Sequence, residues 1–359
     1  MDRVIDPNMA TVTVGVREMA CRLNNDGTSF DATAENLERT AMIKMSGEQL
    51  RQTVLAEGLA VLAAQQANTV PPAFQVSNCV VDPTAAEKVT RIYTGTDGVM
   101  VPLVTESEKV KRRKKVCEKR RLVIRKLSPL PPRKPGADLP FKEYKVIVFY
   151  DEHGKHWHQT FSRCKRTSVG VLIRRDAKRL GFSKADEKVA NVDGATWIRN
   201  QLQERPDQLP LDGLGLDFYH LSENVHRCRR GVFGEDPAGT KWTEELLHLL
   251  KHEGYEPAHA KIFGWRQGLR SPKKKEFADK LLNYITDRRD MINYPEFQKK
   301  GWQIGSGPTE SRCKTTTHRI KGRGRRWDRQ SAEDVAALTT LKDSGQWEAY
   351  WRTLSPKTI

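Results

Sequence analysis

Strand patterns alternate with helix patterns along the middle of the chain, and this alternation limits the possible folds more than any other feature. Strands that alternate with helices are typical of a mixed α/β sheet, so we expect that fold class. In chain order the segments are an apolar, β-branched strand (89–104), a hairpin that turns near residues 152–155 (143–161), a helix from Thr167 or Ser168 to Leu180 that ends at Gly181, and two strand-to-helix units (188–206 and 214–234).

Helical patterns lie on both sides of this central region. Three short helices are predicted within residues 15–66, and they could form a helix-turn-helix module. The second helix carries Asp31, Glu35 and Glu38 against a single arginine, so a plain helical packing unit is the alternative. The expected organisation is a helical N-terminal unit (1–80), the first part of a core (81–235, with a basic insertion at 105–140), an all-helical insertion (236–294), and the second part of the core with basic C-terminal helices (295–359).

The net charge indicates a polyanionic partner. The 359 residues include 62 Lys or Arg and 45 Asp or Glu, which gives a formal net charge of +17. Nucleic acid is the expected polyanion, because a membrane partner would call for a long apolar run or a basic amphipathic helix, and neither is found. The six cysteines form no CxxC pair, which argues against a zinc ribbon and a disulfide framework. No secretory leader is recognised, so we expect a reducing, cytoplasmic location.

A basic segment near the end of the chain contains one acid. Residues 303–327 (QIGSGPTESRCKTTTHRIKGRGRRW) hold seven cations suited to phosphates. Glu310 would repel those phosphates unless it holds a divalent cation at the phosphate being cut. The alternative is that Glu310 only sits in the first turn of a helix beginning near Gly307 and Pro308, where an acid suits the helix dipole. The cations predicted to grip phosphates are Arg312, Lys314, Arg319, Lys321, Arg323, Arg325 and Arg326.

Two further acids could join Glu310. Asp97 and Asp193 both lie in Asp-Gly pairs attached to apolar strands. An ordinary turn is the alternative for each, and it is weaker for Asp193, because a helix follows and not a returning strand. An acid at the carboxyl end of a strand that enters a helix, as expected for Asp193, lies where α/β sheets bind ligands. Together the three carboxylates would supply hard oxygen ligands for two Mg²⁺ or Mn²⁺ ions, as phosphoryl transfer requires.

A long basic segment lies between the first two predicted strands. Residues 109–136 carry thirteen cations and one glutamate, and we interpret them as a long basic excursion between two strands, whose Pro-rich end cannot be regular structure. Its cations would clamp a DNA backbone, and they include Lys111, Arg112, Arg113, Lys114 and Lys115. A nuclear-import signal and a disordered charged loop are the alternatives.

The histidines of HGKHWHQ (His153, His156 and His158) are expected on a solvated hairpin, with His156 and His158 on one strand face. Trp302 and Trp327 could stack on unpaired bases or lie in the core.

Four blocks of the sequence resemble those of ISKra-type bacterial insertion-sequence transposases. The blocks are GTDGVMVPL, NVDGATWI, LDFYHLSENV and GWQIGSGPTESRCKTTTHRIKGRGRRW, and the similarity spans roughly residues 89 to 350. This resemblance implies a ribonuclease-H-like core in which Asp97, Asp193 and Glu310 are the catalytic, metal-binding triad. It also matches Asp217 and His220 to a (Cys/Asp)-x-x-His pair shared with Mutator-like transposases, with a site-shaping role; a simpler interpretation is that His220 caps or orients the helix that follows.

The expected activity is therefore metal-dependent cleavage and strand transfer of double-stranded DNA at element ends and at a target. An enzyme that handles two ends is expected to act as a homodimer or higher homo-oligomer, associated with the bacterial nucleoid. The basic excursion is longer than the resemblance implies, and the chain begins close to the helical unit. These departures keep open a non-catalytic, domesticated or decayed DNA-binding derivative, and a nuclease on the same fold that cuts without joining is a third possibility.

Overall fold

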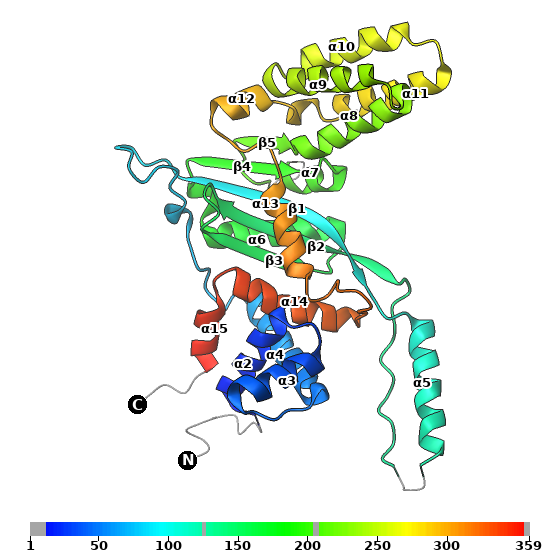
Figure 1. Ribbon diagram of the computed structural model, residues 1–359. Coiled ribbons are helices and arrows are strands. Elements are labelled where there is room, and N and C mark those ends of the chain that lie inside the picture. Colours follow the sequence, from blue (N-terminus) through cyan, green and yellow to red (C-terminus); the bar gives the residue numbers. More distant parts are fainter. Residues whose placement is uncertain (1–11, 124–126, 204–207, 355–359) are drawn as a thin grey trace.

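The computed structural model describes residues 12–123, 127–203 and 208–354, and a five-stranded mixed sheet lies at its centre (Figure 1). The strand order is β3-β2-β1-β4-β5. β2 runs antiparallel to β1 and β3, whereas β1, β4 and β5 are parallel. The predicted α/β class with a mixed sheet is confirmed. The strands are β1 (Arg91–Pro102), β2 (Phe141–Asp151), β3 (Trp157–Ser162), β4 (Glu187–Val192) and β5 (Gly213–Leu216).

The two faces of the sheet bury separate hydrophobic cores, because successive side chains of a strand point to opposite faces. On β1, Tyr93 and Val99 belong to one core and Ile92 to the other. On β2, Val148 belongs to the first core and Phe149 to the second. Strands buried on both faces read as near-continuous apolar runs, which explains why these segments are recognisable in the sequence.

Three helices follow the later strands and cover the face that Ile92 occupies. They are α6 (Val169–Leu180), α7 (Thr196–Leu202) and α8 (Phe218–Phe233). Gly181 ends α6 in the left-handed conformation, with φ of 73°, as predicted from the sequence. Short 3₁₀ turns occur at Val76–Asn78, Arg166–Ser168 and Phe182–Lys184.

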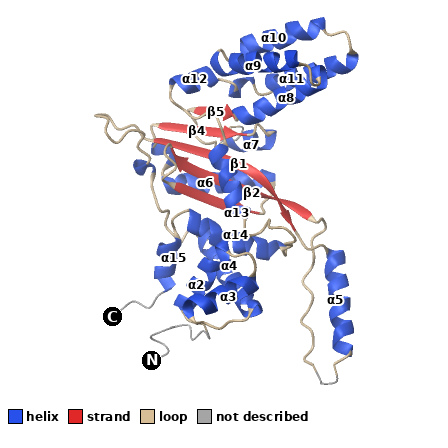
Figure 2. Cartoon of the chain, in the orientation of Figure 1, coloured by secondary structure: helices blue, strands red, loops and turns tan. Residues whose placement is uncertain are grey.

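The region beyond α8 is built from helices (Figure 2). Asp236 caps the first of them through the Ala238 N–H, and Pro237 occupies its first turn. These helices pack on α8 at the end of the molecule farthest from the N-terminal helices (Figure 1). They are α9 (Pro237–His252), α10 (Tyr255–Gly268), α11 (Pro272–Thr286), a 3₁₀ turn at Arg289–Met291, and α12 (Tyr294–Lys299).

The other face of the sheet is covered by the last part of the chain together with the N-terminal helices. α4 packs directly on α14, and a Cβ at Gly58 would lie 2.3 Å from the Asp334 carbonyl oxygen, so only glycine allows this approach. Trp302 and Trp327 are buried in the same core, so their interpretation as core residues is confirmed. The helices of this layer are α2 (Val14–Asp26), α3 (Phe30–Ala41), α4 (Gly47–Gln66), α13 (Gly307–Thr317), α14 (Arg329–Asp343) and α15 (Trp347–Leu354).

A basic arm projects from the body between β1 and β2 (Figure 1). Its outgoing half is a helix, α5 (Glu106–Arg121), which a capping box between Thr105 and Glu108 starts. The sequence pattern did not predict this helix, which the capping box and the strong helix formers of the Lys/Arg run sustain without an apolar stripe. The described residues of the Pro-rich return are irregular, as predicted.

Among the helices that the structure describes, none combines the length and apolar character that a bilayer crossing requires.

Candidate active site

Asp97 lies within a long strand and not at a turn. It pairs with Val146, and Gly98 pairs with Lys145, in the antiparallel ladder between β1 and β2. The alternative interpretation of this Asp-Gly pair as a hairpin turn was therefore wrong. The Asp97 carboxylate accepts a hydrogen bond of 2.5 Å from the Gly98 N–H. Its other oxygen lies 3.8 Å from the Cys313 thiol of α13, so Asp97 faces that helix.

Gly95 allows α13 to approach this strand. Gly95 and Asp97 point to the same face, because they are two residues apart on one strand. A Cβ at Gly95 would lie 1.9 Å from Thr309 Oγ1, within the first turn of α13. The close contact therefore fixes Thr309, and with it the neighbouring Glu310, over the strand that carries Asp97.

Asp193 and Asp217 follow adjacent parallel strands. Asp193 comes directly after β4 and Asp217 directly after β5, and the Asp217 N–H donates to the Val192 carbonyl over 2.8 Å. Gly194 then turns the chain with φ of 77°, a conformation that favours glycine, and the Asp193 carboxylate accepts from the Ala195 N–H at 2.8 Å. The two acids consequently share the carboxyl edge of the sheet.

Asp217 also begins helix α8. Its carboxylate accepts a hydrogen bond from the Tyr219 N–H at 2.8 Å, so Asp217 and not His220 caps this helix. The second carboxylate oxygen accepts from the Ser306 hydroxyl at 2.5 Å. Both oxygens of this buried side chain are thus anchored by the protein itself.

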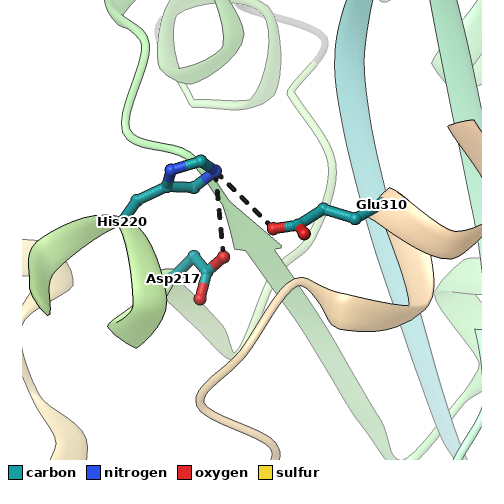
Figure 3. Close-up of side chains that lie close together, drawn as sticks. All are labelled: Asp217, His220 and Glu310. Atoms are coloured by element: carbon teal, nitrogen blue, oxygen red, sulfur yellow. Dashed lines mark ion pairs between the residues drawn. The ribbon is translucent and has the colours of Figure 1, made fainter. Parts of the chain in front are cut away.

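Glu310 reaches toward this edge from the first turn of α13 (Figure 3). One of its oxygens lies 3.7 Å from His220 Nε2, and the same nitrogen lies 3.9 Å from Asp217. Pro308 occupies the start of the helix, so the local role that the sequence also allowed for Glu310 holds alongside these contacts. The Glu310 side chain keeps 45% of its surface exposed, which leaves it open to a ligand from solvent.

The predicted triad lines one small cavity. Asp97, Asp193 and Glu310 surround it together with His220, and no lysine or arginine lines its wall. Burial, with the negative charge of Asp193 as a further cause, raises the pKa of Asp97. Burial and then the neighbouring Asp217 raise the pKa of Glu310. Lysines and arginines border the adjoining grooves and not this cavity, among them Lys314 beside Glu310 and Arg288 beside Asp193.

Two overlapping sets of ligands can be drawn from these side chains. Asp217, His220 and Glu310 have ligand atoms that all lie within 4.8 Å of one another, and they are the one such group in the parts of the chain that the structure describes. Asp97 and Asp193 line one cavity with His220 and Glu310, but they do not form such a group with Glu310. The sequence pattern did not single out Ser306, Cys313 or Gly95. Of these three residues, only Cys313 could have been predicted from the sequence, because it lies three residues after Glu310 and therefore on the same face of the helix.

The seven predicted phosphate-gripping cations do not share one environment. Lys314, Lys321, Arg323 and Arg326 are exposed, and Arg325 is half-buried. Arg312 lies over the Trp157 ring at 3.8 Å. Arg319 departs from its predicted role: it is buried, and it donates to the carbonyl and side-chain oxygens of Asn24 at 3.1–3.3 Å. It therefore ties α13's end to the N-terminal helices instead of presenting a guanidinium on the surface.

Lys111, Arg112, Lys114 and Lys115 are exposed on α5, and Arg113 is half-buried. The exposed side chains of this set are therefore available to an anionic partner.

The histidine-rich hairpin differs from its prediction. His158 is buried, with Nε2 3.6 Å from the Asp176 carboxylate, so this end of the hairpin is not solvated. His156 precedes the strand and stacks on Phe74 at 5.3 Å, so it does not share a strand face with His158. His153 contacts the Val81 carbonyl.

No protein-family model matches the chain. A curated relative, described as "UPF0236 protein in vanSb 3'region" from Streptococcus gallolyticus, is 24% identical over 169 residues. The match covers 47% of this chain and 36% of that protein, so it spans about a third of the relative's length. The relative's name states no biochemical activity, and the similarity assigns none to this chain.

Proposed function

We propose that this chain is a DDE transposase that cleaves and joins DNA strands with the help of divalent cations. The observation that carries the proposal is the meeting of Asp97, Asp193 and Glu310, separated widely in sequence, around one cavity. The strand order β3-β2-β1-β4-β5, with β2 antiparallel and acids on β1 and after β4, is the arrangement expected of a ribonuclease-H-like core. The resemblance of the sequence blocks to ISKra-type transposases supports the same assignment.

The side chains fit Mg²⁺ or Mn²⁺ as the bound group. Carboxylate oxygens are the ligands that these hard cations prefer, and the cavity wall offers three carboxylates without a lysine or arginine to neutralise them. The raised pKa values of Asp97 and Glu310 reflect the cost of keeping these buried or crowded groups ionised. A pair of divalent ions would remove that cost.

Each part of the site has a separate task in this proposal. Asp97, Asp193 and Glu310 would hold the ions, which supply activation of an attacking water or 3′-hydroxyl and neutralise the leaving oxygen. Asp217 positions Ser306 and the start of α8, and so fixes His220 beside Glu310. Lys314 and Lys321 lie on the same groove as Glu310 and would hold the DNA phosphates without reading sequence.

The direct test is strand cleavage by a Glu310→Gln variant. Loss of this carboxylate removes several kcal/mol of charge stabilisation, so cleavage in Mg²⁺ should fall by at least about a thousandfold while DNA binding stays unchanged. Glu118→Gln, which neutralises an exposed acid on α5, is the matched control and should cleave normally. Full cleavage by the Glu310 variant would remove the proposal.

Two outcomes separate the rival functions. A wild-type protein that binds terminal-repeat DNA but never nicks it, even in Mn²⁺, would be a non-catalytic DNA-binding derivative. A protein that cuts but gives no joined product in a strand-transfer assay would be a nuclease on this fold. In the proposed role the protein acts on double-stranded DNA as a homodimer or larger assembly in the bacterial cytoplasm.

A further inference from the structure

A strongly cationic cleft lies between the basic arm and the N-terminal helices, away from the carboxylates. Its volume is about 760 Å³, and nine lysines or arginines line it against two acids, Asp31 and Asp328. The cations come from separate parts of the chain: Arg51 from α4, Arg112 from α5 and Lys134 from the irregular return of the arm. Residues that are distant in the sequence therefore contribute positive charge to the same cleft.

The arm helix presents one face to this cleft. Lys109, Arg112, Arg113 and Val116 line it, and their spacing of three, four and seven residues places them on one side of α5. Lys111, Lys114 and Lys115 do not line it and fall on the opposite side of the helix. The set of cations 111–115 thus divides into a cleft face and an outer face.

Several cleft cations lack a carboxylate partner. Among the described residues, Arg112 and Lys134 have no ion pair, and Arg325 donates only to the carbonyls of His318 and Arg319. Four others are paired with carboxylates: Arg51 with Glu48, Lys109 with Asp328, Arg133 with Glu106 and Arg326 with Glu108. Arg319 lies at the floor, where burial, with repulsion from Arg325, lowers its pKa to about 10. The cations of the cleft still outnumber the acids, and this excess of positive charge favours an incoming polyanion.

A second groove joins the cleft to the candidate active site. Glu310 and Lys314 line this groove from one face of α13 and Lys321 from the turn that follows the helix, together with residues of β1 that include Asp97. Arg325 lines both the groove and the cleft. Arg325 is therefore a contact that a backbone could share between the groove at the carboxylates and the cleft at the arm.

We propose that this cleft binds the phosphate backbone of duplex DNA beyond the point of cleavage. The inference rests on the proposed function, because it names where the same DNA substrate continues. Phosphate contacts of this kind position a duplex and do not depend on its sequence, so a duplex of arbitrary sequence is a suitable probe.

The test compares two triple variants that lose the same charge. Arg51→Gln/Arg112→Gln/Lys134→Gln removes one cation from each of three segments that line the cleft, whereas Lys111→Gln/Lys114→Gln/Lys115→Gln neutralises the outer face of α5. Each phosphate contact contributes about 0.9 to the slope of log affinity against log salt. Fluorescence anisotropy should show that slope falling by about 2–3 for the cleft variant and by less than about 1 for the outer-face variant, with unchanged melting temperatures for both.

Equal slopes for the two triples would overturn the inference, as would tighter binding to single-stranded than to duplex DNA. The outcome is independent of cleavage. If the salt slope falls only in the cleft variant but the protein never cuts DNA, the proposal that the cleft binds DNA stands and the proposed activity is refuted. If cleavage is normal but both triple variants have equal salt slopes, only the proposed DNA-binding role of the cleft is refuted.

Discussion

The contact between Gly95 and α13 predicts that one added methyl group will disable the site. In Gly95→Ala the new Cβ would lie 1.9 Å from Thr309 Oγ1, 3.0 Å from its Cβ and 3.1 Å from its Cγ2. An ordinary contact needs about 3.4 Å or more, so α13 must move off β1 by about 1.5 Å at this point. Glu310 is the next residue and moves with it.

A displacement of about 1 Å in a catalytic group costs on the order of a hundredfold in rate, and overpacking costs about 1–3 kcal/mol of stability. Gly95→Ala should therefore lower the rate of Mg²⁺-dependent cleavage about a hundredfold and lower the melting temperature. Its DNA affinity should stay near that of the wild type, because the exposed cations are retained. Single-turnover cleavage of a labelled duplex measures the rate separately from binding.

The double variant Gly95→Ala/Thr309→Ala is the internal control. Thr309→Ala removes Oγ1, which is buried without a hydrogen-bond partner, and leaves a Cβ contact of 3.0 Å that a shift of a few tenths of an ångström relieves. The double variant should therefore cleave at least about tenfold faster than Gly95→Ala alone. Gly264→Ala on α10, where a Cβ meets nothing within 4 Å, should behave as wild type. Wild-type cleavage by Gly95→Ala would refute the argument that this contact sets the position of Glu310.

Two further variants test the supporting structure. Asp217→Asn should slow cleavage by about 10–100-fold without abolishing it, because Asp217 orients Ser306 and the start of α8. The same kinetic assay measures this rate. A loss of rate as large as that of Glu310→Gln would indicate that Asp217 is a direct metal ligand instead. Asp334→Asn should stabilise the protein at pH 7 by about 1–2 kcal/mol after allowance for solvent screening, since burial raises the pKa of Asp334 to about 6. A carboxyl with a raised folded-state pKa contributes most below its unfolded pKa near 4, and that contribution is lost as pH rises through about 6. Denaturant unfolding should therefore show a higher free energy of unfolding for Asp334→Asn than for the wild type at pH 7 but not at pH 4. An equal gain in the free energy of unfolding at both pH values would contradict this reasoning.

Local sequence patterns were sufficient for the elements of the core. The strand segments are recognisable because their residues are buried on both faces, and Gly181 marks a helix end that needs a left-handed residue. The α5 helix was missed, because a run of lysines and arginines has no apolar periodicity. The capping box between Thr105 and Glu108 was the signal available for it.

The composition of the site depends on topology, which local patterns do not contain. Asp193 and Asp217 become neighbours only because β4 and β5 are adjacent and parallel. Arg319 illustrates the same limit in the opposite direction. Its place in a basic segment indicated a phosphate contact, but packing between the Phe30 and Trp327 rings, at 4.8 and 5.4 Å, buries it.

In the proposed function, the cluster of acids lowers the stability of the fold but provides ligands for metal ions. Asp97 and Glu310 both have raised pKa values, so ionising them costs stability in the metal-free protein. Function often requires such a cost, because a site that is already neutralised by its own lysines or arginines has little affinity for a metal ion.

The location of bound Mn²⁺ tests the central claim most directly, and anomalous diffraction from crystals soaked in Mn²⁺ would measure it. The account predicts anomalous peaks within coordination distance of the carboxylates of Asp97, Asp193 and Glu310, and their loss in Glu310→Gln crystals. A single peak held by Asp217, His220 and Glu310, with Asp97 and Asp193 uninvolved, would contradict it, as would the absence of any peak at saturating Mn²⁺.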